Sequence, residues 1–382
     1  MFPPIRTGTS FYSRNLAQAL ADRGNRVTVI TVKNEDTERD DYPFPIFRIP
    51  ALHLPFKNYF KHFRVTSLFP WNYITVTRIA RGAEVDVVLL VNHYLDIAFP
   101  AIAAARRNSI PLVCSVGTQL QSPNPRRHLI LNFLDRLICG KLIFPFCQKI
   151  ISWDNEVLRY LNDVHGNKVV DKSVVINYGV NGDPEVFLQH QHDYDLHNQI
   201  IGVGAVTEQR DFTPLVKALK LIADEFPQLC LKIAGHIYWD AAIHLARELG
   251  LADRIIFTGE LPHSKVLKEI KRSDVFFVSL TGKYIGLGTA TIESMMLGVP
   301  TIANVPNDLL GKVVLKNMED IMLLDGTSPN EIAVKLRRLL NDKNLRALIG
   351  SGGRQFVTEN MSWAKIAQEM EMLFASVACN SA

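Results

Sequence analysis

Residues 275–303 read VFFVSLTGKYIGLGTATIESMMLGVPTIA and form the most informative stretch of the chain. The pattern predicts a buried strand, a glycine loop, a helix over 290–296 and a second apolar strand. Gly286 and Gly288 let backbone amides approach a ligand closely, and the helix directs its positive end toward the same place. These features suit a diphosphate, and the carboxylate of Glu293, one helical turn further on, could accept hydrogen bonds from two ribose hydroxyls. An ordinary strand–loop–helix connection with Glu293 in solvent is the alternative.

Strands and helices alternate through the rest of the chain. Short apolar strands and amphipathic helices follow one another over residues 14–176 and again over 200–303. This alternation predicts parallel sheets covered by helices. The length of 382 residues is enough for two domains with a core each. We therefore expect an α/β protein of two doubly wound, Rossmann-like domains that face each other across a cleft, with ligands at the carboxyl ends of the strands.

The predicted domain boundary lies near the polar segment 188–198, which holds three His and two Asp and is typical of a solvated linker. We expect a first domain over 1–190 and a second over 191–361, with a last helix at about 362–382. The start of the chain is unusual for this architecture, because a loop and a helix over 14–23 precede any strand. We expect either that the first strand is missing or that the sheet is built without it.

Composition and charge exclude several classes of protein. The five Cys are too few and too scattered for a disulfide framework and show no zinc or redox spacing, so a reduced, cytoplasmic chain is expected. We expect no secretory leader, and no run of about 20 apolar residues could span a membrane. The apolar run over 129–153 is interrupted by charged residues and is predicted to form one or two packed helices.

Positive charge is concentrated between residues 42 and 149, where there are 13 Lys and Arg and only 4 acids, although the net charge of the whole chain is +4. Between Phe56 and Tyr73 the cations alternate with aromatic residues. Such a segment can lie at the cytoplasmic face of an anionic membrane, among the headgroups; a half-buried helix with its aromatic rings in the core is the alternative. Nucleic acid is not expected as a partner, because the basic residues form no dense run.

The stretch Gly286-Leu287-Gly288, Glu293 and Gly298-Val299-Pro300 resembles the donor site of the GT-B glycosyltransferases, specifically their large retaining family 4. In that family a Gly-Phe-Gly loop, a Glu and a small-Gly-x-Pro turn follow one another in the same order. The resemblance extends over nearly the whole chain through the order and spacing of further segments: Gly8-Thr9, 176–181 with Phe187, 233–235, 253–259, 273–275 and Trp363. It implies a GT-B fold whose last helix crosses back to the first domain.

The resemblance also implies which residues bind which part of the substrates. In the second domain, Arg210 would act as the catalytic cation on the diphosphate, Glu293 would bind the ribose, and the backbone near Leu261 the base. The complete set expected at the donor is Arg210, Ala205, Leu261, Gly286, Leu287, Gly288, Thr289 and Glu293. The set expected on the sugar and acceptor side, in the first domain, is Gly8, Thr9, Gly117, Thr118 and Gln119.

Three positions depart from the family pattern. Ile285 stands where the family has the first Glu of its donor motif, Ala205 where it has a phosphate-binding Arg, and Val116 where it has an active-site His. Arg210 replaces the family's Lys and keeps the charge, and a guanidinium can bridge two phosphate oxygens; a surface Arg is the alternative. His93 follows a predicted strand and could supply a catalytic imidazole in the cleft, although a lone His in such a place is more often structural.

The expected reaction is transfer of a hexose from a nucleoside diphosphate sugar to a saccharide or lipid-linked acceptor, with UDP-glucose or UDP-galactose as the donor that the resemblance implies. Neither a metal ion nor another cofactor is expected, because the diphosphate is a good leaving group and can itself take the acceptor's proton. Two other patterns are not interpreted as sites. Gly202-Val203-Gly204 lacks the third glycine of a dinucleotide fingerprint, and the His and Asp residues over 190–197 lie in the polar linker. An epimerase or hydrolase of the same fold and a non-catalytic sugar-nucleotide-binding scaffold are the alternatives.

Overall fold

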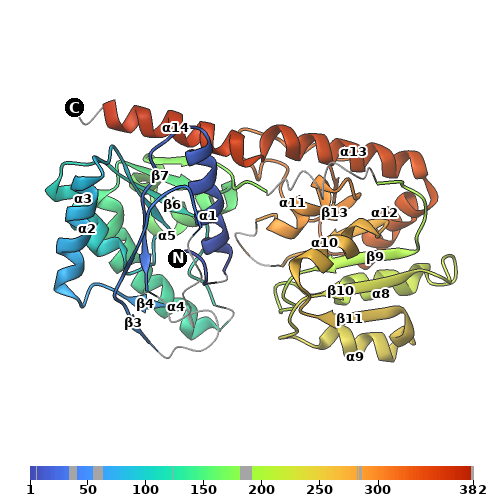
Figure 1. Cartoon of the computed structure of the whole chain (residues 1–382). Coiled ribbons are helices and arrows are strands. Elements are labelled where there is room, and N and C mark those ends of the chain that lie inside the picture. Colours follow the sequence, from blue (N-terminus) through green and yellow to red (C-terminus); the bar gives the residue numbers. More distant parts are fainter. Residues whose placement is uncertain are drawn as a thin grey trace. The chain divides into compact units, whose positions relative to one another are not determined.

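The computed structural model describes residues 1–5, 7–33, 41–54, 63–122, 124–180, 192–281, 283 and 286–379. The chain forms two compact units. Unit 1 comprises Met1–Gly179 and Trp363–Ala382, and unit 2 comprises Val180–Ser362 (Figure 1). The boundary predicted at residue 190 falls outside the described residues. Within the described part of the chain, no helix combines the length and the apolar character that crossing a membrane requires.

Unit 1 is built around a parallel sheet of four strands in the order β5-β6-β7-β8. Its strands are β5 (Val88–Val91), β6 (Leu112–Val116), β7 (Lys149–Ser152) and β8 (Ser173–Val175). Every residue of β6 is buried, as expected for an apolar strand inside a parallel sheet. Because the strands run in the same direction, the segments that follow β5, β6 and β7 meet at one edge of the sheet.

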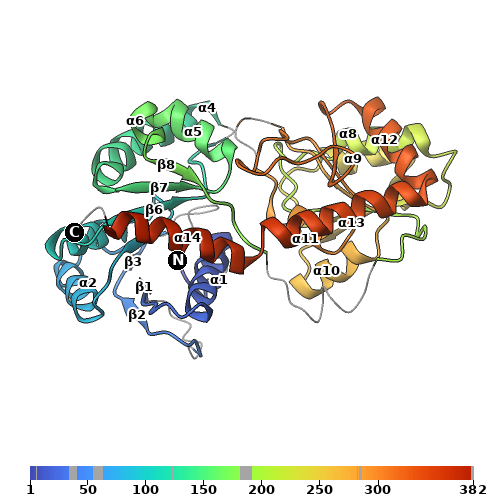
Figure 2. The ribbon, with the colours of Figure 1, turned by 90° about the horizontal axis from the view of Figure 1, so that it is seen from above.

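Shorter strands and several helices complete unit 1. The strands β1 (Val29–Val32) and β2 (Ile46–Ile49) pair in parallel, whereas β3 (Leu52–His53) and β4 (Arg64–Val65) pair antiparallel. The helices are α1 (Gly8–Asp22), α2 (Pro70–Gly82), α3 (Ala98–Arg107), α4 (Pro125–Leu134), the π-helix η2 (Asp135–Ile143), η3 (Phe144–Phe146), α5 (Asn155–His165), α6 (Asn167–Val170) and α14 (Trp363–Cys379). Helix α14 packs beside α1 (Figure 2), and Arg23 pairs with Glu371 at 2.7 Å.

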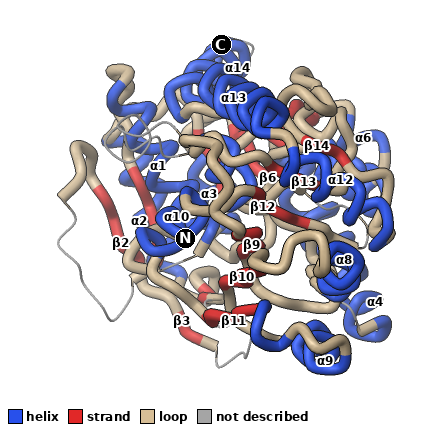
Figure 3. The backbone as a smooth tube through the Cα atoms, turned by 90° about the vertical axis from the view of Figure 1, so that its right-hand side faces the viewer, coloured by secondary structure: helices blue, strands red, loops and turns tan. Residues whose placement is uncertain are grey.

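Unit 2 contains a parallel sheet of six strands in the order β11-β10-β9-β12-β13-β14. Its strands are β9 (Gln199–Val203), β10 (Cys230–Ala234), β11 (Ile255–Gly259), β12 (Val275–Val278), β13 (Thr301–Ala303) and β14 (Met322–Leu323). Figure 3 shows β11, β10, β9 and β12 side by side. The chain adds strands to one side of β9 and then, from β12 onward, to the other side, so the strand order reverses between β9 and β12.

The helices of unit 2 form two groups. They are α8 (Thr213–Ile222), α9 (Ala241–Glu248), η4 (Ala252–Arg254), α10 (His263–Lys271), α11 (Thr289–Met296), α12 (Pro329–Asn341) and α13 (Lys343–Asn360). Helix α8 packs against α9 and α12, and α11 packs against α10 and α13. Ile200, Leu219 and Phe277 are buried in the core that the sheet shares with its helices. The predicted α/β architecture with two parallel-sheet units is therefore confirmed.

Two predictions about unit 1 are wrong. Gly8 and Thr9 were expected in a loop before a helix over 14–23, but they begin α1. The reason is the side chain of Thr7, which caps the helix by accepting a hydrogen bond from the Ser10 amide at 3.2 Å. The apolar run over 129–153 was expected to form one or two packed helices; η2 is packed through Cys139 and Ile143, but the prediction is wrong for α4, none of whose residues is buried.

A third prediction, that residues 188–198 form a solvated linker, is wrong for the residues of that segment whose side chains are buried. His192 and Tyr194 are 4% and 8% exposed. The His192 ring donates through Nε2 to the Ser273 carbonyl at 3.0 Å, and the buried guanidinium of Arg346 donates to the Tyr194 carbonyl at 2.9 Å. Residues 192–198 therefore pack against the rest of unit 2 through polar contacts that their composition does not reveal.

Candidate functional site

The donor-side residues of unit 2 gather where the strand order of its sheet reverses. Ligands of open α/β sheets bind beyond the carboxyl ends of the strands at such a point, because the following loops diverge there and leave space. The loop after β9 carries Ala205 and Arg210, and the loop after β12 leads to Gly286 and α11. The two loops are joined, since the Thr281 amide donates to the Gln209 carbonyl at 2.7 Å.

Arg210 lies between these two loops. Gly204 has φ +129°, and a Cβ added there would lie 1.8 Å from Arg210 Nη1, so only glycine leaves room for the guanidinium. A Cβ on Gly288 would lie 4.0 Å from Arg210 Nη2. The Nε atom of Arg210 is buried without a hydrogen-bond partner, and burial lowers the pKa of the guanidinium. No ion pair of this side chain is found among the described residues, so a half-buried cation lies close to Gly288 without an anion.

The glycine loop ends at the amino terminus of α11. Gly288 caps the helix with φ +79° and no side-chain hydrogen bond, and the first turn contains no acid. The first amides of a helix lack partners within the helix and carry a partial positive charge. Leu287 is buried, and its carbonyl accepts a hydrogen bond from Thr291 Oγ1 at 2.6 Å, which holds the loop to the helix. Gly286 is half-buried and Thr289 is exposed.

Glu293 is paired with a residue that the sequence analysis did not single out. His263 Nε2 lies 2.8 Å from Glu293 Oε1, and the hydrogen bond raises the pKa of His263 above its ordinary value. The Glu293 side chain is 16% exposed, so it is not the fully solvated carboxylate of the alternative interpretation. Leu261, expected near the base, stands two residues before His263 on the segment that follows β11. His263 and Glu293 are 30 residues apart in the sequence, so no local sequence pattern could predict that they would pair.

Ala205 belongs to a fixed part of the same edge. The Val206 amide donates to the His236 carbonyl at 2.9 Å, and the Gly235 amide donates to the Gly259 carbonyl at 2.9 Å. A Cβ on Gly235 would lie 2.1 Å from the Gly204 carbonyl oxygen, so the loops after β9 and β10 are in direct contact. The backbone at Ala205, the position where the family has a phosphate-binding Arg, is thus held by its neighbours, but it carries no cationic side chain.

In unit 1, three of the predicted acceptor-side residues come together through Asn92 and Tyr94. Asn92 Nδ2 donates to Thr9 Oγ1 at 2.6 Å, and the Gly117 amide donates to Asn92 Oδ1 at 3.1 Å. The Tyr94 hydroxyl is hydrogen-bonded to the side chains of Thr9 and Thr118. Burial raises the pKa of Tyr94, which keeps it neutral as a hydroxyl partner.

The remaining two members of that set are less constrained. Gly8 is exposed at the start of α1, and an added Cβ there would meet nothing within 4 Å. Gln119 is half-buried after β6. Gly117, by contrast, lies against an aromatic wall, because its Cβ would come within 2.1 Å of the Trp153 ring. Tyr12 stacks on Trp153 with ring centroids 4.2 Å apart, and the sequence analysis noted neither ring.

His93 is not placed as predicted. It was expected to face a cleft, but its side chain has no exposed surface, because it stacks on Phe144 and packs against η2 within unit 1. Its Nε2 atom lies 3.4 Å from Asp135 Oδ1, and His165 Nε2 lies 3.2 Å from Asp135 Oδ2. Tyr160 also donates to Asp135. Burial opposes ionisation of Asp135, but the hydrogen bonds from His165 and His93 outweigh it, and the pKa of Asp135 lies well below its usual range.

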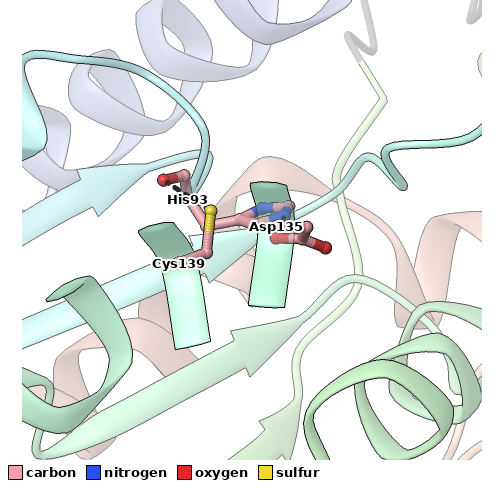
Figure 4. A group of neighbouring side chains, drawn as sticks. All are labelled: His93, Asp135 and Cys139. Carbon is pink, nitrogen blue, oxygen red and sulfur yellow. Dashed lines mark hydrogen bonds and ion pairs between the residues drawn. The ribbon is translucent and has the colours of Figure 1, made fainter. Parts of the chain in front are cut away.

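This cluster contains the described residues whose side chains could hold a metal ion. His93, Asp135 and Cys139 place their ligand atoms within 4.8 Å of one another (Figure 4). Nitrogen, oxygen and sulfur ligands of this kind are those of zinc. Burial together with the charge of Asp135 raises the pKa of Cys139 far above its usual value, so the thiol is protonated when no metal ion is bound. Asp135 Oδ2 accepts hydrogen bonds from Tyr160 and His165, whereas Asp135 Oδ1 and both ring nitrogens of His93 are buried without a hydrogen-bond partner among the described residues.

Phe56, Phe187, His190 and Ile285, which were discussed from the sequence, lie outside the described residues. Ile285 is the residue that replaces the family's first Glu. Val116, at the position of the family's active-site His, is buried in β6. In this chain the side chain at position 116 therefore belongs to the core of the sheet.

Two family models match the chain. The model described as Glycosyltransferase Family 4 matches residues 6–183, and the model described as Glycosyl transferases group 1 matches residues 189–356. An uncharacterised glycosyltransferase of Methanocaldococcus jannaschii is 26% identical over 254 residues, which are 63% of this chain and 62% of that protein. A GDP-mannose-dependent alpha-(1-6)-phosphatidylinositol monomannoside mannosyltransferase of Mycobacterium tuberculosis is 26% identical over 177 residues. That match covers 45% of this chain and 46% of the relative, so the chain spans less than two thirds of both relatives.

A solved structure extends the likeness over the whole fold. HepE of Anabaena, in complex with UDP and glucose, has a TM-score of 0.67 and 15% sequence identity, and the match covers 98% of both chains. At that identity the likeness shows the fold alone. With the two family models, which lie end to end along the chain, it shows that the protein is a GT-B glycosyltransferase similar to family 4.

Proposed function

We propose that this protein transfers a hexose from a nucleoside diphosphate sugar to a saccharide or lipid-linked acceptor. The observation that carries the proposal is Arg210, a half-buried cation whose Nε atom is buried and which has no ion-pair partner among the described residues. Its guanidinium lies against Gly204 and close to Gly288, where α11 begins. A diphosphate is the anion that suits this combination, because a guanidinium and free helix amides can bind its oxygens together.

In this proposal the residues of unit 2 stabilise the leaving group. Negative charge develops on the diphosphate as the bond to the sugar breaks, and Arg210 with the first amides of α11 is placed to stabilise it. Glu293 accepts hydrogen bonds from the ribose, and the backbone near Leu261 contacts the base. The leaving diphosphate oxygen takes the acceptor's proton, so neither a metal ion nor a protein base is required.

The residues of unit 1 would orient the sugar and acceptor. Thr9, Gly117 and Thr118 are already held together by Asn92 and Tyr94. Since a preformed arrangement of this kind lowers the entropy lost on reaction, we assign Gly8, Thr9 and residues 117–119 to the acceptor side. His93 is not part of this assignment, because its ring is buried against Asp135.

UDP-glucose or UDP-galactose is the proposed donor, and GDP-mannose is the competitor to test, since a relative is named for it. The experiment measures product formation with each of the three donors, with and without a chelator, and titrates UDP and GDP by calorimetry. We expect the uridine donors to be used, with no loss of rate on chelation. Preferential use of GDP-mannose would overturn the donor assignment, and loss of activity that divalent metal restores would overturn the metal-independent mechanism.

A matched pair of variants tests the site. Arg210→Ala is expected to lower kcat/KM about 100- to 1,000-fold, because it removes the only side-chain cation proposed on the diphosphate. Arg247→Ala, which removes an exposed cation from the end of α9, is expected to change nothing. Unchanged turnover in Arg210→Ala would refute the assignment. Binding of nucleotide without any product from any donor would favour the scaffold alternative, and a free sugar or an epimer as the product would favour a hydrolase or epimerase.

The protein is proposed to act in the cytoplasm, where nucleotide sugars and reduced thiols coexist. All five cysteines, at positions 114, 139, 147, 230 and 379, are free thiols. Labelling of intact and permeabilised cells with a membrane-impermeant thiol reagent tests the location through Cys379, which is exposed. Labelling of intact cells would contradict a cytoplasmic location.

A further inference from the structure

Helix α4 and the π-helix η2 expose an apolar surface on unit 1. Six large apolar side chains form it, and we name them the α4–η2 face: Leu129, Ile130, Phe133, Leu134, Leu137 and Leu142. Leu129, Ile130 and Phe133 are 69%, 60% and 65% exposed. Single exposed apolar residues are common, but a contiguous group of this size marks an interaction site.

The six residues are neighbours on one helical stretch. Phe133 and Leu134 lie three and four positions after Ile130, and Leu137 lies four and three positions after them, which places these residues along one side of a helix. The opposite side of η2 faces inward, because Asp135, Cys139 and Ile143 are buried. Asp135 is fixed there by His93, Tyr160 and His165. The buried network of unit 1 therefore determines which side of η2 points outward.

The exposed charge on α4 and η2 themselves is entirely positive. Arg126, Arg127, Arg136 and Lys141 are exposed on the same two helices. Asp135 is the only acid between residues 124 and 149, and it is 1% exposed. Anionic lipid headgroups would attract these four cations, while the leucine and phenylalanine side chains enter the boundary between headgroups and acyl chains.

A second copy of the chain is a poorer occupant. In a two-fold contact the same patch meets itself, so Arg126, Arg127, Arg136 and Lys141 of one copy would face those of the other. Like charges placed opposite one another disfavour association. A surface with negative charge and an apolar interior has the complementary chemistry, and a bilayer with acidic phospholipids provides both.

We propose that the α4–η2 face docks this glycosyltransferase on an anionic lipid surface. The lipid surface is a partner that the transfer reaction itself does not require. The evidence for it comes only from the surface of unit 1. It also moves the membrane contact expected from the sequence, which was placed between Phe56 and Tyr73. Residues 55–62 of that stretch lie outside the described residues, while Trp71 and Ile74 on α2 are 53% and 46% exposed and provide a competing surface.

Flotation of the full chain with vesicles tests the proposal without donor or acceptor, so its outcome does not depend on catalysis. The vesicles contain phosphatidylcholine alone or phosphatidylcholine with phosphatidylglycerol. We expect flotation only with the acidic vesicles and a loss of binding as salt is raised. Failure to float with acidic vesicles at low salt would overturn the proposal.

Variants locate the contact. Replacement of Ile130, Phe133 and Leu137 together by Gln is expected to weaken binding at least about tenfold, because it removes the apolar contribution. Arg126→Gln with Arg127→Gln is expected to weaken it about 30-fold at low salt. Val334→Gln with Leu348→Gln, which changes equally exposed apolar residues of unit 2, is the matched control and should bind as the unaltered chain does.

Two further results would overturn the assignment to this face. One is loss of binding in Trp71→Gln with Ile74→Gln while the α4–η2 variants still float, which would place the contact on α2. The other is that the unaltered chain does not bind acidic vesicles but forms a concentration-dependent dimer, and that the triple Gln variant no longer forms this dimer. Unchanged melting temperatures of the variants, expected because these side chains are exposed, establish that any loss of flotation does not come from unfolding.

Discussion

The carboxyl edges of the two sheets carry polar groups of different kinds. In unit 1 Asn92 joins Thr9 to Gly117, and the buried ring of His93 faces the carboxylate of Asp135 at 3.4 Å. Among the described residues of unit 2, the Nε atom of Arg210 has no hydrogen-bond partner, and Glu293 pairs with His263, whose side chain is 65% exposed. Buried groups that satisfy one another fix a local structure, whereas a buried group left unpaired is available to a ligand. The charged groups of unit 1 thus face one another inside its core, whereas unit 2 presents a cation that faces no anion among the described residues.

The largest expected effect tests the structural role of the unit 1 network. Asp135→Ala leaves the buried His93, Tyr160 and His165 without their common partner, and it should lower the free energy of unfolding by about 3–5 kcal/mol. Chemical denaturation followed by circular dichroism measures this loss. A loss below about 1 kcal/mol would show that the network does not stabilise unit 1.

Acid titration sharpens the same test. The folded pKa of Asp135 is lowered, so its contribution to stability is present above the ordinary carboxyl pKa of about 3.9 and is lost as the pH falls below that value. The difference in unfolding free energy between the unaltered chain and Asp135→Asn should therefore shrink as the pH falls below about 4. A constant difference across that range would contradict the ionised carboxylate.

The next effect concerns the position of the cation in unit 2. Gly204→Ala places a methyl group where Arg210 Nη1 lies and strains a backbone at φ +129°. The displaced guanidinium should lower kcat about 10- to 100-fold, because small misplacements of a charge-stabilising group are costly. Gly326→Ala is the matched control, since an added Cβ there meets nothing within 4 Å. Equal activity of Gly204→Ala and Gly326→Ala would contradict the proposal that the position of the Arg210 guanidinium matters for catalysis.

The contrast between the units was only partly predictable from the sequence. Alternating apolar strands and amphipathic helices are local patterns, so the α/β architecture followed from them, and the loop order around Gly286 and Gly288 pointed to the donor edge. The partners of His93 could not be inferred, because Asp135 and His165 lie 42 and 72 positions further along and meet it only through the packing of η2 and α5. The exposure of α4 was missed for a similar reason. An apolar helix has the same pattern whether its face is covered by the protein or left open.

Glu293 offers a smaller effect that is specific for the nucleotide. Glu293→Gln keeps the size of the side chain but removes its charge, and it should weaken UDP binding about tenfold, as expected for a charge-assisted hydrogen bond. Calorimetry with UDP and with its 2′,3′-dideoxy form makes the test selective. The unaltered chain should prefer UDP, and the variant should largely lose that preference. Glu260→Gln removes a comparable but 75% exposed partner of His236 and serves as the control.

The smallest effect is the pH dependence of the His263–Glu293 pair. The pKa of His263 is raised in the folded chain, so the pair contributes stability below about pH 6.5 and loses it as the pH rises through the folded pKa. Because the His263 side chain is 65% exposed, the contribution should be about 0.5 kcal/mol or less. Titration of the imidazole by NMR should give a pKa above that of a free histidine in the unaltered chain and an ordinary one in Glu293→Gln. An equal pKa of His263 in both chains would mean that Glu293 does not pair with His263 in solution. Glu293 would then be available to the ribose without first losing a partner, unlike the paired Asp135 of unit 1.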